Sequence, residues 1–151
     1  GKSVFLAQRL VLDLIKGRNY LVVRQVAGRV QQSCYNEILK ALDMFGVRDK
    51  FKVTKSSISI ESGGEVLFAG LDDPEKIKSI TPKRGVLTDI WIEEATEIKK
   101  ESFLQLNKRL RGLSEFKKRL TLSFNPTSKG NWIYKHFFRG KGYIFKSPCG
   151  G

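Results

Sequence analysis

Cysteine, histidine and long apolar runs are all scarce in this sequence, and each shortage argues against a class of protein. The two cysteines, Cys34 and Cys149, have no metal-binding spacing, so a zinc site is not expected and a reducing intracellular setting is the simplest interpretation. His136 is the only histidine, which leaves little material for a histidine-based catalytic triad. No run of about 18 apolar residues occurs, so we expect no membrane-spanning segment.

Acidic residues are also few relative to basic ones. Fifteen Asp and Glu stand against 28 Lys and Arg, which leaves a net charge of +13 and an isoelectric point near 9.9. Such an excess predicts attraction to polyanions, either nucleic acid or an anionic membrane surface. Most aromatic residues occur singly among the basic ones and form no amphipathic membrane face, which favours nucleic acid. A basic surface that serves only solubility is the alternative.

Hydrophobic periodicity predicts one α/β domain over residues 1–151, with a mainly parallel central sheet flanked by helices. Helical spacing is found in 4–15, 33–45, 102–111 and 132–138, and buried strands are predicted for 20–23, 86–92, 120–124 and 143–145. Alternation in 57–61, then Gly63-Gly64 and 65–69, predicts an antiparallel β-hairpin insertion with one solvent-exposed face. The stretch 70–84 contains two prolines and is predicted to be a loop with room for one helical turn.

The chain opens on Gly1-Lys2-Ser3 at the head of an amphipathic helix, the last part of the phosphate-loop pattern G-x-x-x-x-G-K-[ST]. Backbone N–H groups at a helix N-terminus bind phosphate, Lys2 would reach the outer phosphates, and the Ser3 hydroxyl would ligate magnesium. The tripeptide alone is also compatible with chance.

A second group of polar residues follows two of the predicted strands. Glu93 and Glu94 end the run Ile90-Trp91-Ile92, which places the first near a magnesium ion and the second where it would polarise water. Asn125 ends the next strand and would hydrogen-bond the γ-phosphate or the attacking water. The alternative interpretations assign no function to these residues: the two glutamates are exposed in a loop, and the asparagine belongs to a simple Asn-Pro turn.

Several segments together resemble the ATPase domain of the large terminase subunit of tailed bacteriophages, over roughly residues 1–138. In order, they are Arg24-Gln25-Val26-Ala27, Phe68-Ala69-Gly70-Leu71-Asp72-Asp73, Lys76-Ile77-Lys78-Ser79, Ile90-Trp91-Ile92-Glu93-Glu94-Ala95, Arg109-Leu110-Arg111-Gly112, Ser123-Phe124-Asn125-Pro126 and Asn131-Trp132.

The resemblance implies a RecA-like P-loop ATPase that uses ATP and Mg²⁺ to drive double-stranded DNA into a procapsid. By position, Glu93 is the magnesium-site acid, Glu94 the catalytic glutamate, and Asn125 part of the motif that couples hydrolysis to movement. The implied partners are the portal and procapsid, the small terminase subunit and neighbouring copies in a ring, with no membrane. The implied location is the host cell cytoplasm.

The chain departs from the family pattern in three ways, the third of which concerns its last residues. Residues 1–151 begin at the last three residues of the phosphate loop, and we expect no part of the nuclease domain that normally follows the ATPase domain within them. The strand predicted within 143–146, followed by Gly150 and Gly151, resembles the strand and first glycines that should precede Gly1. We therefore expect a permuted or excised ATPase domain in which Gly150 and Gly151 help to bind phosphate, with an unrelated tail as the alternative.

Basic clusters carry the prediction of sequence-tolerant DNA binding through phosphate contacts. The candidates are Lys108, Arg109, Arg111, Lys117 and Lys118. Two other functions fit the same sequence. One is a helicase-type translocase on another nucleic acid, and the other is an inactive DNA-binding or assembly module, for which the incomplete phosphate loop also argues.

Overall fold

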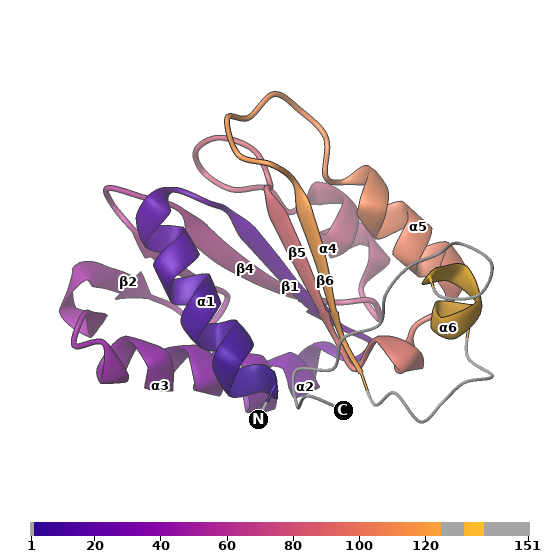
Figure 1. The fold of residues 1–151 in the computed structure, drawn as a ribbon, viewed down its shortest axis with the longest axis horizontal. Helices are drawn as coiled ribbons and strands as arrows, with labels where there is room; N and C mark the ends of the chain where they lie inside the picture. Colours follow the sequence, from indigo (N-terminus) through magenta and orange to yellow (C-terminus); the bar gives the residue numbers. More distant parts are fainter. Residues whose placement is uncertain (1, 125–131, 138–151) are drawn as a thin grey trace.

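A six-stranded sheet forms the centre of the computed structural model, which describes residues 2–124 and 132–137 (Figure 1). The strands lie in the order β2-β3-β4-β1-β5-β6. Neighbours among β4, β1, β5 and β6 pair in parallel, whereas β2, β3 and β4 pair antiparallel. The strand bounds are β1 Tyr20–Arg24, β2 Phe51–Val53, β3 Ser57–Ile60, β4 Glu65–Gly70, β5 Asp89–Glu93 and β6 Arg119–Ser123.

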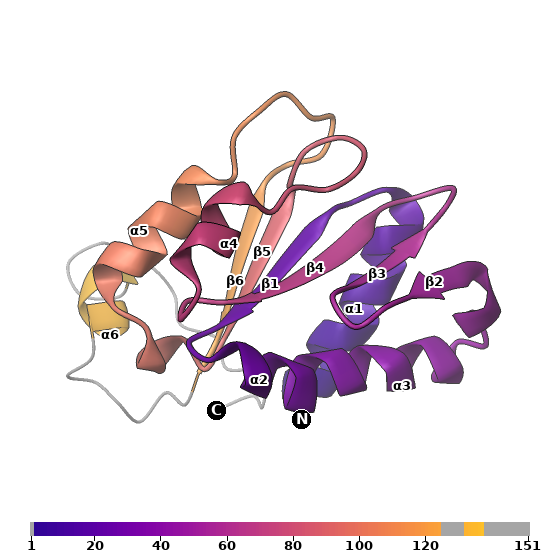
Figure 2. The same ribbon diagram turned by 180° about the vertical axis from the view of Figure 1, so that it is seen from behind.

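Helices cover both faces of the sheet, as Figures 1 and 2 show from opposite sides. The bounds are α1 Lys2–Lys16, α2 Ala27–Val30, α3 Asn36–Met44, α4 Pro74–Ser79, α5 Lys100–Lys108 and α6 Trp132–Phe137, with the short segments η1 Gln31–Tyr35, η2 Arg48–Lys50 and η3 Ala95–Glu97. One face packs against α1, α2 and α3, and the other against α4, α5 and α6. The predicted α/β class, with a mainly parallel sheet flanked by helices, is confirmed.

Side chains of the central strands alternate between these two cores. In β5, Trp91 packs with α1 and α3, whereas Ile90 and Ile92 pack with α4 and α5. Successive strand residues point to opposite faces, so Glu93 belongs to the face of Trp91. Arg24 shares that face because it follows Tyr20 and Val22 at the same spacing in β1.

The predicted hairpin is present, but its second strand is not solvent-exposed on one face. All six residues of β4 are buried because β4 also pairs in parallel with β1 and is covered on both faces. The alternation in β3 is confirmed, since only Ile58 and Ile60 are buried there. The sequence analysis did not predict β2, and its strand over 86–92 begins too early, because the paired strand starts at Asp89.

The helix predicted to begin at Ser33 begins instead at Ala27. The segments α2, η1 and α3 follow one another without a break from residue 27 to 44, and η1 is a single π-helical segment. Ser33 therefore lies inside a helix, where its Oγ is within hydrogen-bond distance, 2.8 Å, of the carbonyl oxygen of Arg29, four residues earlier. A serine hydroxyl in a helix interior commonly lies near that carbonyl.

A buried charged network lies at the opposite end of the strands from Glu93. Tyr20 donates a hydrogen bond of 2.5 Å from its hydroxyl to Asp13 Oδ2. Arg119 contacts Asp13 and reaches Asp89 Oδ2 at 2.7 Å, and Arg18 Nη1 lies 2.9 Å from Asp89 Oδ1. Burial raises the pKa of the Tyr20 hydroxyl above its usual range, and the hydrogen bond to Asp13 raises it further. The network joins α1, β1, β5 and β6 at this end.

Four of the predicted site residues and one predicted strand lie outside the described residues. They are Gly1, Asn125, Gly150, Gly151 and the segment 143–145. None of the helices in the described part of the chain is long and apolar enough to cross a bilayer.

Candidate functional site

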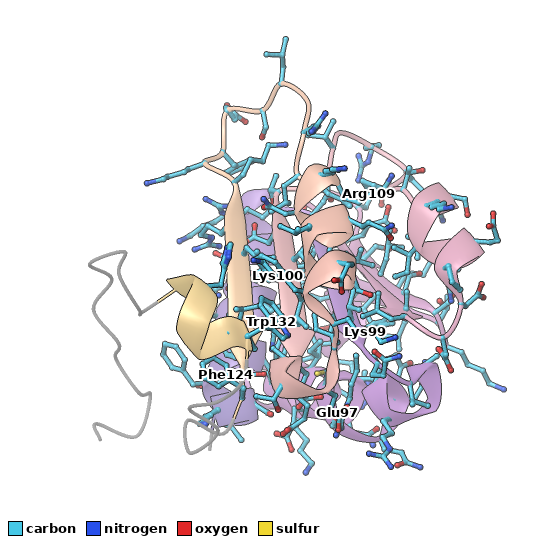
Figure 3. All side chains as sticks on the ribbon, turned by 90° about the vertical axis from the view of Figure 1, so that its right-hand side faces the viewer. Glu97, Lys99, Lys100, Arg109, Phe124 and Trp132 are labelled. Carbon is cyan, nitrogen blue, oxygen red and sulfur yellow. The ribbon has the colours of Figure 1, made fainter. Side chains whose placement is uncertain are left out.

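The start of α1 meets the carboxyl ends of β5 and β6, which brings the two predicted halves of the site together. Ser3 Oγ donates a hydrogen bond of 3.0 Å to Glu93 Oε1. Lys2 Nζ donates one of 2.5 Å to the carbonyl oxygen of Phe124, directly after β6. Figure 3 shows Phe124 at the same end of the sheet as Glu97. Residues 90 or more positions apart in sequence are thus in direct contact, as parallel strands that end at one edge allow.

Glu93 is the best-connected side chain of this edge. It is only 5% exposed, and a buried carboxylate needs hydrogen-bond donors to remain charged. Ser33 Oγ lies 2.5 Å from Glu93 Oε2, and Cys34 Sγ lies 2.8 Å from the same oxygen. Arg24 Nη1 lies 3.9 Å from Oε2 as well. One carboxylate oxygen therefore faces η1 and β1, and the other faces Ser3.

Cys34 acts at this site as a neutral donor. Burial raises the pKa of its thiol above the usual range, and the neighbouring Glu93 carboxylate raises it further. A protonated thiol donates weakly to a carboxylate and is a poor nucleophile or metal ligand. Cys34 therefore supports Glu93 and is not itself a reactive group.

Glu94 has an unusual backbone conformation. Its φ of 50° and ψ of 53° lie in the left-handed region, and it is the one non-glycine residue with positive φ in the described part of the chain. A side chain in that region costs about 1–2 kcal/mol, and such residues cluster at active sites. Glu94 lies in the turn directly after β5. Its half-buried side chain therefore does not continue the alternation of the strand, which places Glu93.

An ion-pair cluster lies beside Glu93 and was not predicted from the sequence. Arg24 Nη2 lies 3.4 Å from Glu97 Oε1, and Arg29 Nη1 lies 3.6 Å from the same oxygen. Arg24 thus spans Glu93 and Glu97, from the end of β1 to η3. Its position fixes a positive charge next to the buried carboxylate.

The donor set suits a magnesium ion that is bound together with phosphates. Among residues 2–124 and 132–137, no group of three or more His, Cys, Asp or Glu side chains gathers as a metal cage. Magnesium is usually held by one or two carboxylates, waters and substrate phosphates, and a single Ser–Glu pair meets that description. The hydroxyl of Ser3 and the carboxylate of Glu93 are oxygen ligands of the kind that magnesium prefers.

The predicted DNA-binding residues lie toward the other end of β6, and they divide into two groups. Arg109 donates to the carbonyls of Lys78 and Ile80, and Lys118 Nζ donates to those of Leu87 and Arg111. Figure 3 shows Arg109 at the end of α5 away from Glu97 and Phe124. The other three side chains, those of Lys108, Arg111 and Lys117, are exposed. DNA binding by all five stays a prediction, and the exposed three fit it best.

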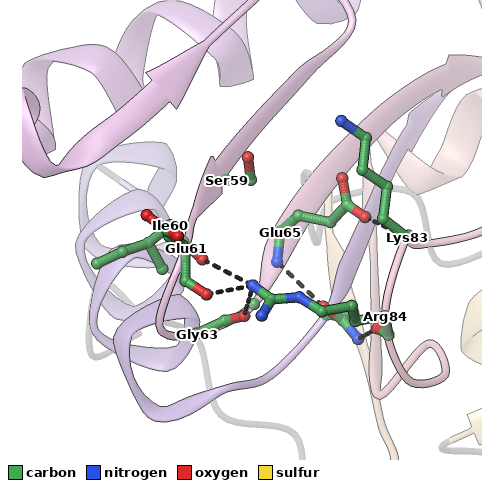
Figure 4. Close-up of a pocket in the computed structure, with 9 residues that line it drawn as sticks. Ser59, Ile60, Glu61, Gly63, Glu65, Lys83 and Arg84 are labelled. Atoms are coloured by element: carbon green, nitrogen blue, oxygen red, sulfur yellow. Dashed lines mark hydrogen bonds between the residues drawn. The ribbon is translucent and has the colours of Figure 1, made fainter.

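A small pocket of about 70 Å³ lies where β1 and β4 begin, far from Glu93 along the strands (Figure 4). The Arg84 guanidinium in it donates to the backbone carbonyls of Ile60, Glu61 and Gly63. The Glu65 carboxylate accepts from the backbone N–H of Lys83. These charged groups therefore bind the protein's own backbone, and the hydrogen bonds of Arg84 stabilise the turn between β3 and β4.

Sequence reasoning assigned Lys2, Ser3, Glu93 and Glu94 to the candidate site, but it did not assign Ser33, Cys34 or Arg24 to it. The motif patterns identify the first four, and the structure brings three of them into contacts at one edge. No sequence motif includes Ser33 or Cys34. Both residues lie in the π-helical segment η1, from which they contact Glu93. The spacing of Arg24 in β1 could have placed it on the face of Glu93, given the strand order.

Comparisons with known proteins match most of this chain. The family model described as phage terminase large subunit matches residues 1–147. The PBSX phage terminase large subunit of Bacillus subtilis is 33% identical over 142 residues, which cover 92% of this chain and 32% of that protein. The terminase large subunit of Bacillus phage SPP1 is 31% identical over 146 residues, which cover 91% of this chain and 35% of that protein. The chain therefore spans about a third of the length of these curated relatives.

The fold is that of solved large terminases. The large terminase of a thermophilic bacteriophage superposes with a TM-score of 0.70 at 14% identity, over 91% of this chain and 34% of that one. The large terminase of bacteriophage HK97 superposes with a TM-score of 0.63 at 10% identity, over 89% of this chain and 29% of that one. The sequence match over nearly the whole chain and the shared fold lead to one conclusion: this chain belongs to the phage terminase large subunit family.

Proposed function

We propose that this chain is the ATPase part of a phage packaging motor, which couples Mg²⁺-dependent ATP hydrolysis to the movement of double-stranded DNA into a procapsid. The observation that carries the proposal is the hydrogen bond of 3.0 Å between Ser3 Oγ and Glu93 Oε1. It joins the end of a phosphate-loop sequence to the first acid after a buried strand. Phosphoryl transfer depends mostly on positioning and electrostatics, so few reactive side chains are needed.

Each residue of the site has a proposed role. Lys2 binds the outer phosphates, Ser3 and Glu93 hold magnesium, Glu94 orients the attacking water, and Asn125 senses the γ-phosphate. When bound, magnesium neutralises charge on the phosphates. The left-handed conformation of Glu94 supports its role, because a strained backbone at the end of a strand re-aims the side chain. Gly150 and Gly151 complete the phosphate loop if the chain is permuted, which stays a prediction.

The proposed partners follow from family membership and charge. Double-stranded DNA would bind exposed basic side chains, among which Lys108, Arg111 and Lys117 are the best candidates. The portal and procapsid, the small terminase subunit and neighbouring copies in a ring would complete the motor in the host cytoplasm. The net charge of +13 supports binding to a polyanion.

The test is ATP turnover with magnesium, measured for this chain and for a chain extended before Gly1 by Gly-Gly-Arg-Gly-Ser, which makes the phosphate loop continuous as Gly-Gly-Arg-Gly-Ser-Gly-Lys-Ser. Turnover that disappears in Glu94→Gln and in Lys2→Ala supports the proposal. Turnover only after extension means that the loop must be continuous. No turnover in either chain contradicts the ATPase function and favours an inactive DNA-binding or assembly module.

A further inference from the structure

Glu93 receives two donors on one oxygen from consecutive residues of one helix. Ser33 Oγ lies 2.5 Å and Cys34 Sγ 2.8 Å from Oε2, whereas Oε1 accepts from Ser3. We propose that Ser33 and Cys34 are positioning residues for magnesium: they hold Oε2 so that Oε1 stays directed at the Ser3 hydroxyl. The inference rests on the proposed function, in which Glu93 supports the metal.

The π-helical segment makes this arrangement possible. Successive residues of an α-helix are rotated by about 100°, so two neighbours do not usually reach the same atom. The wider turn of a π segment, with its i→i+5 hydrogen bonds, reduces that rotation, and such single-turn bulges are frequent at functional sites. Here η1 lies between α2 and α3, and both Ser33 and Cys34 belong to it. Both side chains reach one carboxylate oxygen on the neighbouring strand β5.

The two donors differ in how firmly they bind Glu93. The Ser33 hydroxyl has one hydrogen, and it also lies 2.8 Å from the carbonyl oxygen of Arg29. Two oxygens 2.5 Å apart require a hydrogen between them, so this hydrogen points to Glu93. Cys34 is fully buried and keeps its weaker bond.

The experiment measures the Mg²⁺ concentration needed for half-maximal binding of a fluorescent ATP analogue, and for half-maximal turnover, in the chain with a continuous phosphate loop. Removal of a group that orients a metal ligand typically costs about 10–100-fold in metal affinity or activity. We expect Ser33→Ala to raise the Mg²⁺ requirement at least about tenfold, and Cys34→Ala to raise it less. Ser33→Thr and Cys34→Ser keep a donor and should restore much of the parent value.

Ser79→Ala is the matched control. Ser79 Oγ donates to the carbonyl of Glu75, four residues earlier, at 2.9 Å, so this variant removes a serine hydroxyl of another helix, far from Glu93. A Mg²⁺ requirement in Ser33→Ala that equals that of Ser79→Ala overturns the inference, as does an effect that Ser33→Thr does not repair. A parent that binds Mg-nucleotide without turnover contradicts the ATPase function alone, and the Mg²⁺ titration of binding still decides the role of Ser33. A parent that binds no Mg-nucleotide overturns both.

Discussion

Lys2 Nζ is hydrogen-bonded to the carbonyl oxygen of Phe124 at 2.5 Å, which links the first turn of α1 to the end of β6. This bond joins the proposed phosphate-binding lysine to the residue before Asn125. A charged ammonium on a neutral carbonyl is readily exchanged for phosphate oxygens, which offer a stronger charge-assisted bond. The contact therefore keeps Lys2 beside the place where phosphates would bind.

Replacement of this ammonium should weaken nucleotide binding. Hydrogen bonds to charged groups contribute about 1.5–3 kcal/mol, which corresponds to roughly 10–100-fold in affinity. We expect Lys2→Met to lower ATP affinity by this factor, as measured by calorimetry in a chain with a continuous phosphate loop. Lys16→Met, an exposed site in the last turn of the same helix, removes the same charge and should bind ATP like the parent. Equal affinities in both variants would contradict the role of Lys2.

We expect Glu94 to be needed for ATP turnover, although its left-handed backbone conformation lowers the stability of the folded chain. Its φ of 50° disfavours every residue with a Cβ, whereas glycine adopts this conformation freely. We therefore expect Glu94→Gly to be more stable to urea than Glu94→Ala by about 1 kcal/mol, with no ATP turnover in either. An alanine variant as stable as the glycine variant would show that the left-handed conformation is not retained in solution.

Alkaline pH should destabilise the fold partly through Tyr20. The pKa of its hydroxyl is raised by burial and by Asp13, so the folded chain keeps a proton that the unfolded chain releases near pH 10. The stabilisation is present below about pH 10 and declines as pH rises further, by at most about 1.4 kcal/mol per pH unit.

We expect the free energy of unfolding to fall more steeply between about pH 10 and 11 in the parent than in Tyr20→Phe. Urea titrations at each pH measure the difference between the two chains, in which the titration of surface lysines cancels. Parallel pH profiles of the two chains would show that Tyr20 does not carry this dependence.

Three exposed basic residues should contribute to DNA binding. We expect the triple variant Lys108→Ala, Arg111→Ala, Lys117→Ala to weaken binding to duplex DNA irrespective of its sequence. The slope of log affinity against log salt should fall by about one for each phosphate that a removed side chain had neutralised. Fluorescence anisotropy over a range of salt concentrations measures both quantities.

A triple variant at Lys50, Lys52 and Lys55 has the same charge change on another exposed part of the surface, near β2. It serves as the control for a general effect of net charge. If both triple variants weaken DNA binding equally, the binding surface is not the one proposed.

Two glycines should respond in opposite ways to alanine. At Gly64 a Cβ would lie 1.7 Å from the carbonyl oxygen of Arg18, so Gly64→Ala must shift the backbone and should cost at least about 2 kcal/mol. At Gly28, inside α2, nothing lies within 4 Å, and Gly28→Ala should stabilise by about 0.5–1 kcal/mol. Chemical denaturation measures both, and the same sign of change in the two variants would contradict the close packing at Gly64.

Much of the fold could be predicted from the sequence because hydrophobic periodicity is a local property. The apolar spacing of 4–15 and the run before Glu93 each depend on the nearest neighbours along the chain, and both elements are confirmed. The exposure of β4 could not be predicted in this way. Its burial on both faces arises from pairing with β1, which is fixed by the strand order and not by the pattern within 65–69.

The residues of the candidate site also divide into those that the sequence could predict and those that it could not. Ser3 and Glu93 carry motifs whose chemistry requires them to meet, so their contact could be predicted. Ser33 and Cys34, which contact Glu93, lie in a π-helical turn of a helix that begins at Ala27, and no periodicity in the sequence predicts such a turn. The helix was predicted to start at Ser33, six residues later than its start at Ala27 in the structure.

The segments α2, η1 and α3 form one continuous helical rod, and Glu93 contacts this rod at η1. The helical stretch 27–44 is about 27 Å long, and Glu93 contacts it at η1, nearer its first end than its last. A rotation of about 5° of this rod would displace its far end by roughly 2 Å. At that end Met44 and Phe45 expose apolar surface, which such a rotation would displace.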